Sequence, residues 1–191
     1  AFTAGDHPAI ATYSGKRWKV EAIDAKGMLV DAATVNGAPF MVWLDGRRGE
    51  GLADVYAWTP SGVEKVYDDE ADGVCVCCRP AAGELDGEPA VAFRDADGSL
   101  REIRLATKSA EGWSTELVTH GGWALGGCPA DGPRMASDGV IVSDGRDGHR
   151  KLYLNDAVLP TGEGAAMQPR EVAGRRFWVE ATNNGVSLVV D

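Results

Sequence analysis

Three of the four cysteines in this chain lie in one short segment, which reads GVCVCCRP over residues 73–80. These are Cys75, Cys77 and Cys78, and the fourth, Cys128, follows much later in the segment GGCPADGP. Thiols can form disulfides, bind soft metal ions or carry out redox chemistry. A use that involves all four requires Cys128 to approach the other three in the folded chain.

The spacing leaves three interpretations open. In the first, Cys128 forms one ordinary disulfide with a member of the group, and the other two cysteines form a strained bridge or remain free, because close sequence neighbours fit disulfide geometry poorly. In the second, thiolates bind a soft metal, copper or zinc, with His120, Met135 and Met167 as auxiliary ligands. In the third, the cluster is redox-active, and the adjacent Arg79 stabilises a thiolate.

A second set of candidate residues consists of arginines that each stand next to a proline, in CRP, GPR and QPR; they are Arg79, Arg134 and Arg170. Converging guanidinium groups can hold a carboxylate, sulfate or phosphate through forked hydrogen bonds. The alternative is that these arginines form salt bridges within the fold, with Asp72, Asp131 or Glu171.

Other residues carry weaker signals. Trp123 could stack on a sugar ring or pack its own loop. The acidic run DDEAD at 68–72 could bind calcium through carboxylate oxygens, but it lacks EF-hand spacing and is expected to be an exposed turn. The sequence contains no nucleophile elbow, P-loop, dinucleotide-binding glycine pattern or His-Glu-x-x-His motif. Catalytic residues therefore stay unassigned, and enzymatic activity stays open.

Short repeats predict the elements that position these residues. IATYSGKRWKVE (10–21) and LATKSAEGWSTE (105–116) align without gaps on Ala, Thr, Ser, Trp and Glu, and each predicts a strand, a turn and a strand. A second strand–turn–strand unit recurs at 30–45, 79–95, 132–144 and 168–181. No segment shows sustained helical periodicity. Joined together, the two units predict antiparallel meanders of four strands.

Several such meanders in series predict an all-β fold, a small β-propeller that forms a single domain over residues 1–191. Four blades are preferred; five blades, a piece of a larger ring or a β-sandwich are the alternatives. The N-terminal strands are expected to complete the last blade. Both cysteine segments fall where the outermost strand of one blade leads to the innermost strand of the next. Neighbouring junctions lie close on one face, which predicts that Cys128 returns to the other cysteines.

The composition limits the range of partners. The formal net charge is -10 over 191 residues and the pI is about 4.8, a poor match to nucleic acids or anionic membranes. No apolar run is long enough to insert into a membrane, and no signal peptide is recognisable. The chain begins without methionine, which suggests a processed or trimmed N-terminus.

The turn KSAEGWS (108–114) resembles an Asp-box without its aspartate, as in the BNR and sialidase-like β-propellers. The segments CVCCRP and GGWALGGCPADGP resemble a group of bacterial sialidase-like proteins with Cys-Cys-Arg-Pro and Gly-Cys-Pro motifs. The resemblance implies an exported bacterial protein, periplasmic or secreted. The chain is too short for the six blades of true sialidases and has no recognisable Tyr/Glu nucleophile pair, so their activity does not transfer.

The sequence therefore predicts a binding protein whose cysteine cluster, Cys75, Cys77, Cys78 and Cys128, holds a soft metal, copper in preference to zinc. The alternative is a sialidase-like glycoside hydrolase or carbohydrate-binding module, in which the three arginines hold an anionic or carbohydrate ligand and the cysteines only brace the loops. An interaction platform is a further alternative, and the oligomeric state stays open.

Overall fold

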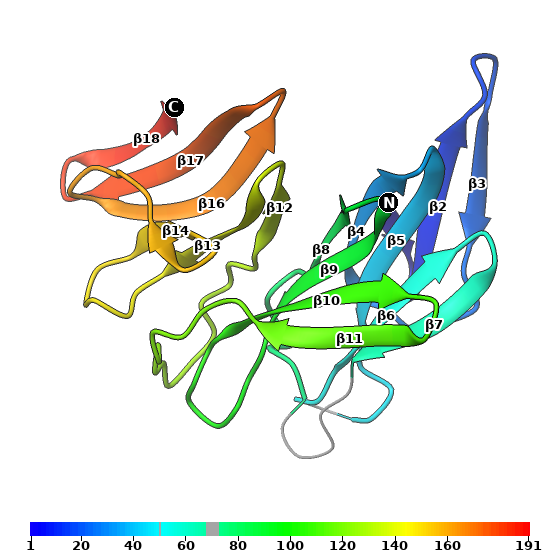
Figure 1. Cartoon of the computed structure of the whole chain (residues 1–191), viewed down its shortest axis with the longest axis horizontal. Helices are drawn as coiled ribbons and strands as arrows, with labels where there is room; N and C mark the ends of the chain where they lie inside the picture. Colours follow the sequence, from blue (N-terminus) through cyan, green and yellow to red (C-terminus); the bar gives the residue numbers. More distant parts are fainter. Residues whose placement is uncertain (50, 68–72) are drawn as a thin grey trace.

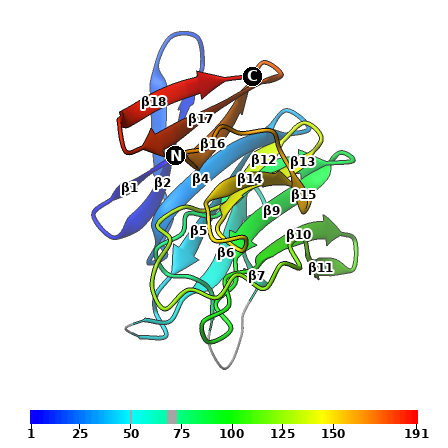
Figure 2. The ribbon, with the colours of Figure 1, turned by 90° about the vertical axis from the view of Figure 1, so that its left-hand side faces the viewer.

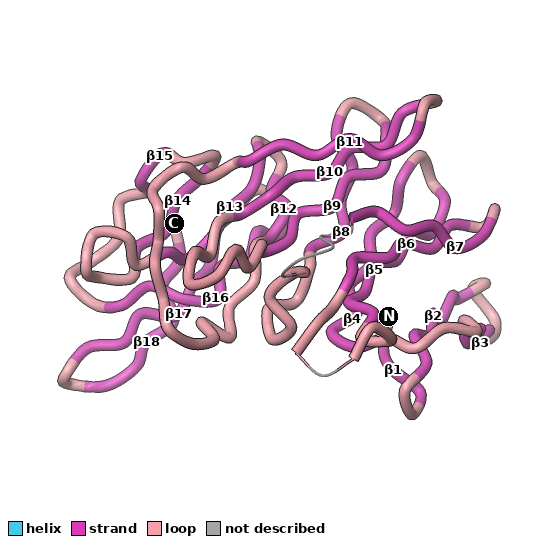
Figure 3. The backbone as a smooth tube through the Cα atoms, turned by 90° about the horizontal axis from the view of Figure 1, so that it is seen from below, coloured by secondary structure: helices cyan, strands magenta, loops and turns pink. Residues whose placement is uncertain are grey.

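The computed structural model describes residues 1–49, 51–67 and 73–191, and this part of the chain consists of strands, turns and loops (Figure 3). It contains no helix, and so no helix long and apolar enough to cross a membrane is found in it. The predicted all-β class is confirmed.

The strands form five antiparallel sheets, and within each sheet every strand pairs with its neighbour in sequence. The first sheet contains β1 (Phe2–Ala4), β2 (His7–Tyr13) and β3 (Trp18–Ala22). The second contains β4 (Met28–Val35), β5 (Ala38–Asp45), β6 (Asp54–Thr59) and β7 (Gly62–Tyr67). The third contains β8 (Ala81–Leu85), β9 (Glu88–Arg94), β10 (Ile103–Ser109) and β11 (Gly112–Leu117).

The fourth sheet contains β12 (Arg134–Ala136), β13 (Gly139–Asp144), β14 (Lys151–Leu154) and β15 (Ala157–Val158). The fifth contains β16 (Ala165–Val172), β17 (Arg175–Thr182) and β18 (Gly185–Val190). The hairpins predicted near residues 30, 79, 132 and 168 are therefore all present, as the first two strands of the last four sheets.

Tight turns of the expected chemistry join these hairpins. Asn36 and Gly37 connect β4 to β5 with φ values of 48° and 77°, and Asp86 and Gly87 connect β8 to β9 with 52° and 82°. Two successive positive φ values define the two-residue turn that matches the twist of a hairpin, and Asn-Gly and Asp-Gly adopt it most readily. Local sequence thus sets the register of both hairpins.

The first strands of successive sheets lie side by side: β4 contacts β8, β8 contacts β12, and β12 contacts β16. The core fills the spaces between sheets. Along β9, Val91 and Phe93 face the second sheet, whereas Ala90 and Ala92 face the fourth. Strand β9 is therefore buried on both faces, and any polar side chain that it carries inward must find partners inside the molecule.

The two ends of the chain differ from the prediction. The N-terminal strands pair with one another and not with the fifth sheet, so the described chain has five sheets, of which the first and the fifth have three strands. These two sheets lie at opposite ends of the molecule, with the fifth sheet nearest the viewer in Figure 2 (Figures 1 and 2). The described chain therefore does not show the expected completion of the last blade by the N-terminal strands, and the number of blades stays a prediction.

Candidate functional site

The four cysteine sulfur atoms meet at one place. Cys75, Cys77 and Cys78 lie between β7 and β8, and Cys128 lies between β11 and β12. The four Sγ atoms are all within 4.8 Å of one another. The predicted return of Cys128 to the other three cysteines is confirmed, and the spacing of the sulfur atoms is compatible with a bound metal ion.

Within this cluster, Cys77 and Cys128 form a disulfide with a Cα–Cα distance of 6.4 Å, while Cys75 and Cys78 are free thiols. The two free thiols are buried, with exposed fractions of 6% and 1%. Their Sγ atoms are 3.1 Å apart, and Cys75 Sγ lies 3.5 Å from Cys77 Sγ. This is one form of the first interpretation above: one ordinary bridge beside two thiols.

Backbone contacts hold the cysteine segment in place. The N–H of Val74 donates to the Ala53 carbonyl at 3.0 Å, and the N–H of Cys75 donates to the Arg94 carbonyl at 3.0 Å. Gly132 allows the second cysteine segment to approach the first, because any side chain at this position would place a Cβ that overlaps the carbonyl oxygen of Arg79. A glycine is required where two backbones approach in this way.

A buried arginine lies against the cluster. Arg94 ends β9 and is 1% exposed, and its guanidinium donates hydrogen bonds to three main-chain carbonyls: Asp131 at 3.1 Å, Ser143 at 3.0 Å and Arg101 at 2.6 Å. In the described part of the chain, no carboxylate forms an ion pair with it. Burial lowers the pKa of Arg94, and the nearby Cys78, Asp144, Cys75 and Asp131 oppose that effect. A cation buried without a paired anion is costly, and the nearby cysteine sulfur atoms and the Asp144 carboxylate can offset its charge.

The two free thiols are coupled through a hydrogen bond between their sulfur atoms. The hydrogen bond between the Cys75 and Cys78 sulfur atoms lowers the pKa of Cys75 to about 6, against the opposing effect of burial. The same hydrogen bond, together with burial, raises the pKa of Cys78. The pair therefore carries one negative charge more readily than two, and that charge lies near Arg94.

The three predicted arginines line a single cavity of about 250 Å³ beside the cluster, together with Cys77, Asp131 and Gln168. The Arg134 and Arg170 guanidinium groups each donate to the carbonyl of the preceding proline, at 2.5 and 3.0 Å. Burial lowers the pKa of Arg170 against the opposing charge of Asp31, the neighbouring Arg79 lowers it further, and Asp131 opposes the shift.

The alternative of internal salt bridges does not hold for the acidic residues that can be described. Asp131 pairs with Arg150 at 3.1 Å, and Glu171 lies 3.7 Å from Arg176. Asp72, like the whole acidic run 68–72, is outside the described residues. In the described ranges, Arg79, Arg134 and Arg170 form no ion pair, so the cavity presents three guanidinium groups to a ligand.

The cavity wall also contains strained and unsatisfied groups. Leu29, Ala130 and Gln168 line it with φ values of 53°, 52° and 52°, which is uncommon for residues with a side chain. Asp131 Oδ1 and Arg134 Nε are buried and have no hydrogen-bond partner. Strain and unpaired polar atoms of this kind concentrate at binding sites.

Two other predicted residues lie elsewhere. Trp123 is 8% exposed, and its ring is covered by Arg94 at 5.1 Å and Arg150 at 5.8 Å. It packs the loop and presents no free face to a sugar. No histidine belongs to the group of four sulfur atoms in the described chain; His120 is exposed, with Nδ1 3.6 Å from Asp156 Oδ2.

The two methionines are strand residues. Met135 lies on β12 and packs against Gly83 of β8, beside the core. Met167 lies on β16, where the register with β17 shifts. Their roles as auxiliary metal ligands stay predictions.

Sequence reasoning missed Arg94. Its signal is present in VAFRD, where a charged residue ends an apolar strand and an aspartate follows it. The corresponding segments read VWLD and VSD, with Leu44 and Ser143 before Asp45 and Asp144.

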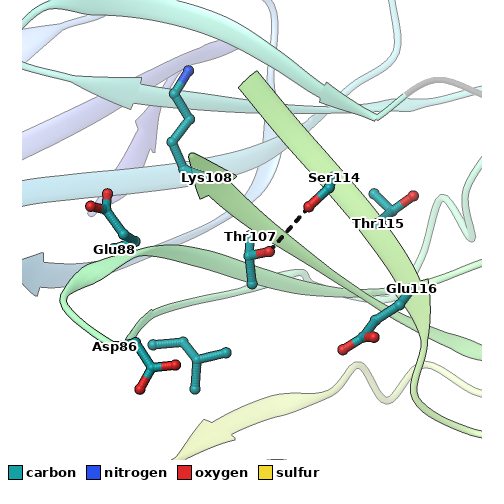
Figure 4. A pocket seen from close by; sticks show the side chains of 8 residues that line it. Asp86, Glu88, Thr107, Lys108, Ser114, Thr115 and Glu116 are labelled. Carbon is teal, nitrogen blue, oxygen red and sulfur yellow. Dashed lines mark hydrogen bonds between the residues drawn. The ribbon is translucent and has the colours of Figure 1, made fainter. Parts of the chain in front are cut away.

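A larger hollow of about 450 Å³ lies on the outer strands of the third sheet (Figure 4). Its lining is polar, with Asp86, Glu88 and Glu116 at the rim and a hydrogen bond of 3.3 Å between Thr107 and Ser114. None of the cysteines or the three arginines lines it. The cysteine cluster and the arginine cavity therefore form the better candidate site.

No protein-family model and no curated protein sequence matches this chain.

Proposed function

We propose that this protein binds a soft metal ion, copper(I) before zinc(II), at the cluster of Cys75, Cys77, Cys78 and Cys128. The observation that carries the proposal is the meeting of four sulfur atoms, from two segments far apart in sequence, within 4.8 Å. Thiolate sulfur is the ligand that copper(I) prefers, and it also binds zinc.

Charge balance favours copper(I). While the Cys77–Cys128 bridge is intact, Cys75 and Cys78 are the two remaining thiol ligands. Copper(I) with two thiolates carries one negative charge, which equals the single positive charge of the buried Arg94. Zinc with four thiolates carries two negative charges and requires the bridge to be reduced first. Arg94 thus supports the smaller, singly charged complex.

The test is an anaerobic titration of the bridged protein with copper(I) in the presence of a competing coloured chelator. We expect one copper per chain and loss of both alkylatable thiols. Cys75→Ser and Cys78→Ser should each abolish tight binding, whereas His120→Gln, a matched change outside the cluster, should bind as the unchanged protein does. Equal binding by Cys75→Ser would contradict the proposal.

The protection assay guards against a folding defect in the serine variants. In the unchanged protein, stoichiometric copper(I) should shield Cys75 and Cys78 from alkylation in mild denaturant. Zinc under the same conditions should shield them less while the bridge is intact, and more after its reduction. Absence of protection by either ion would count against a metal site.

A second candidate function is recognition of an anionic ligand, including a carboxylated sugar, as a carbohydrate-binding module or a glycoside hydrolase would require. It is favoured by the three guanidinium groups that line one cavity without an ion pair in the described chain. Arg134→Ala should lose binding of sulfate or of a sialic acid in calorimetry. Arg17→Ala, a change at an exposed residue between β2 and β3, should not lose it.

We also propose that the fold is a β-propeller and that the protein is exported. The side-by-side order of β4, β8, β12 and β16 supports a β-propeller with those strands innermost. The Cys77–Cys128 disulfide supports an oxidising compartment, in keeping with an exported, periplasmic or secreted protein.

A further inference from the structure

The cysteine cluster contains a second motif that the metal proposal does not use. Cys75 and Cys78 are separated by two residues, the Cys-x-x-Cys spacing of redox dithiols. Their sulfur atoms are 3.1 Å apart and buried. Cys75 Sγ is also 3.5 Å from Cys77 Sγ, which is bonded to the exposed Cys128. A buried dithiol therefore lies in contact with a disulfide that reaches the surface.

We propose that this protein exchanges thiols and disulfides with small anionic disulfides, and that Cys75 and Cys78 supply the electrons through the Cys77–Cys128 bridge. The proposal is independent of metal binding, although bound copper would block it because both use the same two thiols.

The internal exchange is balanced. The Cys75 thiolate attacks Cys77 Sγ, so a Cys75–Cys77 bond forms while the Cys77–Cys128 bond breaks, and the electron pair leaves on Cys128. Cys78 then attacks Cys75, which forms a Cys75–Cys78 disulfide and releases Cys77. Two electrons and two protons have moved from the buried pair to Cys77 and Cys128. The intermediate bridge spans one residue, a poor geometry that favours the second step.

The surroundings of Cys128 favour its release as the leaving group in the first step. The main-chain N–H of Ala130 donates a hydrogen bond to Cys128 Sγ at 3.2 Å. A donor at this sulfur stabilises negative charge on it as the bond breaks, and a stabilised thiolate leaves faster. Cys128 is also exposed, so the released thiol can meet a molecule from solvent.

The arginine cavity gives the class of substrate. Cys77 lines that cavity together with Arg79, Arg134 and Arg170, which form no ion pair in the described ranges. A disulfide that approaches Cys77 and Cys128 from this side meets three guanidinium groups and one carboxylate, Asp131, which is already paired with Arg150. The excess of positive charge attracts a disulfide with carboxylates and repels a cationic one. The Cys128 thiolate attacks that disulfide and releases one thiol; Cys77 then attacks Cys128, restores the bridge and releases the second thiol.

The experiment uses the whole bridged protein, with two thiols per chain, and two probes: glutathione disulfide, which is anionic, and cystamine, which is cationic. We expect glutathione disulfide to yield two thiols per chain and to leave no alkylatable cysteine. Its rate should exceed that of cystamine by about tenfold or more at low salt. Arg134→Gln should reduce this preference, and Arg17→Gln should leave it unchanged.

Alkylation of the released thiol distinguishes thiol–disulfide exchange from a purely structural role of the cysteines. In Cys78→Ser the first step can occur but the second cannot, so N-ethylmaleimide added to the native protein should label Cys128. In Cys75→Ser, Cys128 should stay unlabelled. Retention of both thiols after treatment with glutathione disulfide would overturn the proposal, and so would absence of Cys128 labelling in a folded Cys78→Ser variant. A rate equal for both probes would overturn the assignment of the substrate class.

Discussion

Leu44 and Arg94 occupy corresponding positions in two neighbouring sheets, and their environments are opposite. Each directly precedes an aspartate, Asp45 or Asp95, and each is fully buried. Leu44 packs in the apolar core between the second and third sheets. Arg94 is instead surrounded by main-chain carbonyls and lies near the Cys75 and Cys78 thiols.

The difference teaches that one repeat can serve two purposes. In the second sheet, the position completes a hydrophobic core. In the third, the same position introduces a charge where a separate segment, 73–80, brings sulfur atoms to meet it. A repeat that departs from its pattern at a single buried position therefore marks the functional part of an otherwise uniform scaffold.

The largest loss of stability is expected when a charged side chain is placed at the apolar position of the second sheet. In Leu44→Arg the guanidinium would be buried among valine and phenylalanine side chains without carbonyl or thiolate partners. We expect a loss of about 5 kcal/mol or more in the free energy of unfolding, and so no cooperative transition. Urea denaturation followed by tryptophan fluorescence measures this. A variant as stable as the unchanged protein would show that the two environments are not opposite.

The reverse change, in which an apolar side chain replaces the buried arginine, should reduce the stability less. Arg94→Leu removes the buried charge but leaves the carbonyls of Asp131, Ser143 and Arg101 without their donor, at an expected cost of about 3–5 kcal/mol. It should also slow alkylation of Cys75, since the counter-charge of its thiolate is gone. The rate is measured with iodoacetamide in the native state. Unchanged alkylation in a folded variant would separate Arg94 from the thiol chemistry.

The contact between the two cysteine segments can be tested without altering a charge. In Gly132→Ala the added methyl group would overlap the carbonyl of Arg79, so one backbone must shift. We expect a loss of about 1–3 kcal/mol and a slower formation of the Cys77–Cys128 bridge in air. Gly126→Ala serves as the matched control, because a Cβ there meets nothing within 4 Å. Similar behaviour of the two variants would argue against a close approach at Gly132.

The smallest effect is expected where the second and third sheets meet near their solvent-exposed edge. The hydrogen bond from Lys108 lowers the pKa of Glu64 against the effect of burial, and Trp113 donates a further bond at 3.0 Å. A folded-state pKa below the unfolded one adds stability above the unfolded pKa, and that stability is lost as the pH falls through the folded value. The contribution should stay below about 1 kcal/mol, because Glu64 is 42% exposed.

Urea midpoints of the unchanged protein and of Glu64→Gln, compared from pH 7 to pH 3, measure this contribution. The two curves should differ most near neutral pH and converge in acid. A constant difference over the whole range would mean that the charge of Glu64 is not what links the sheets.

The sequence by itself determined the local structure. Strand periodicity and Asn-Gly or Asp-Gly turns specify the hairpins, because these preferences act over a few residues. The repeat also placed both cysteine segments at neighbouring junctions, which was enough to predict the meeting of four sulfur atoms and the convergence of three arginines on one cavity.

The tertiary structure alone decided the pairings. Cys77 rather than Cys75 or Cys78 bonds to Cys128, Trp123 is covered by two arginines, and the N-terminal strands form their own sheet. Each of these outcomes depends on the relative position of segments far apart in the chain, to within an ångström or two. Local preferences cannot fix such distances, because they arise only when the sheets pack and the buried charge of Arg94 must find its partners.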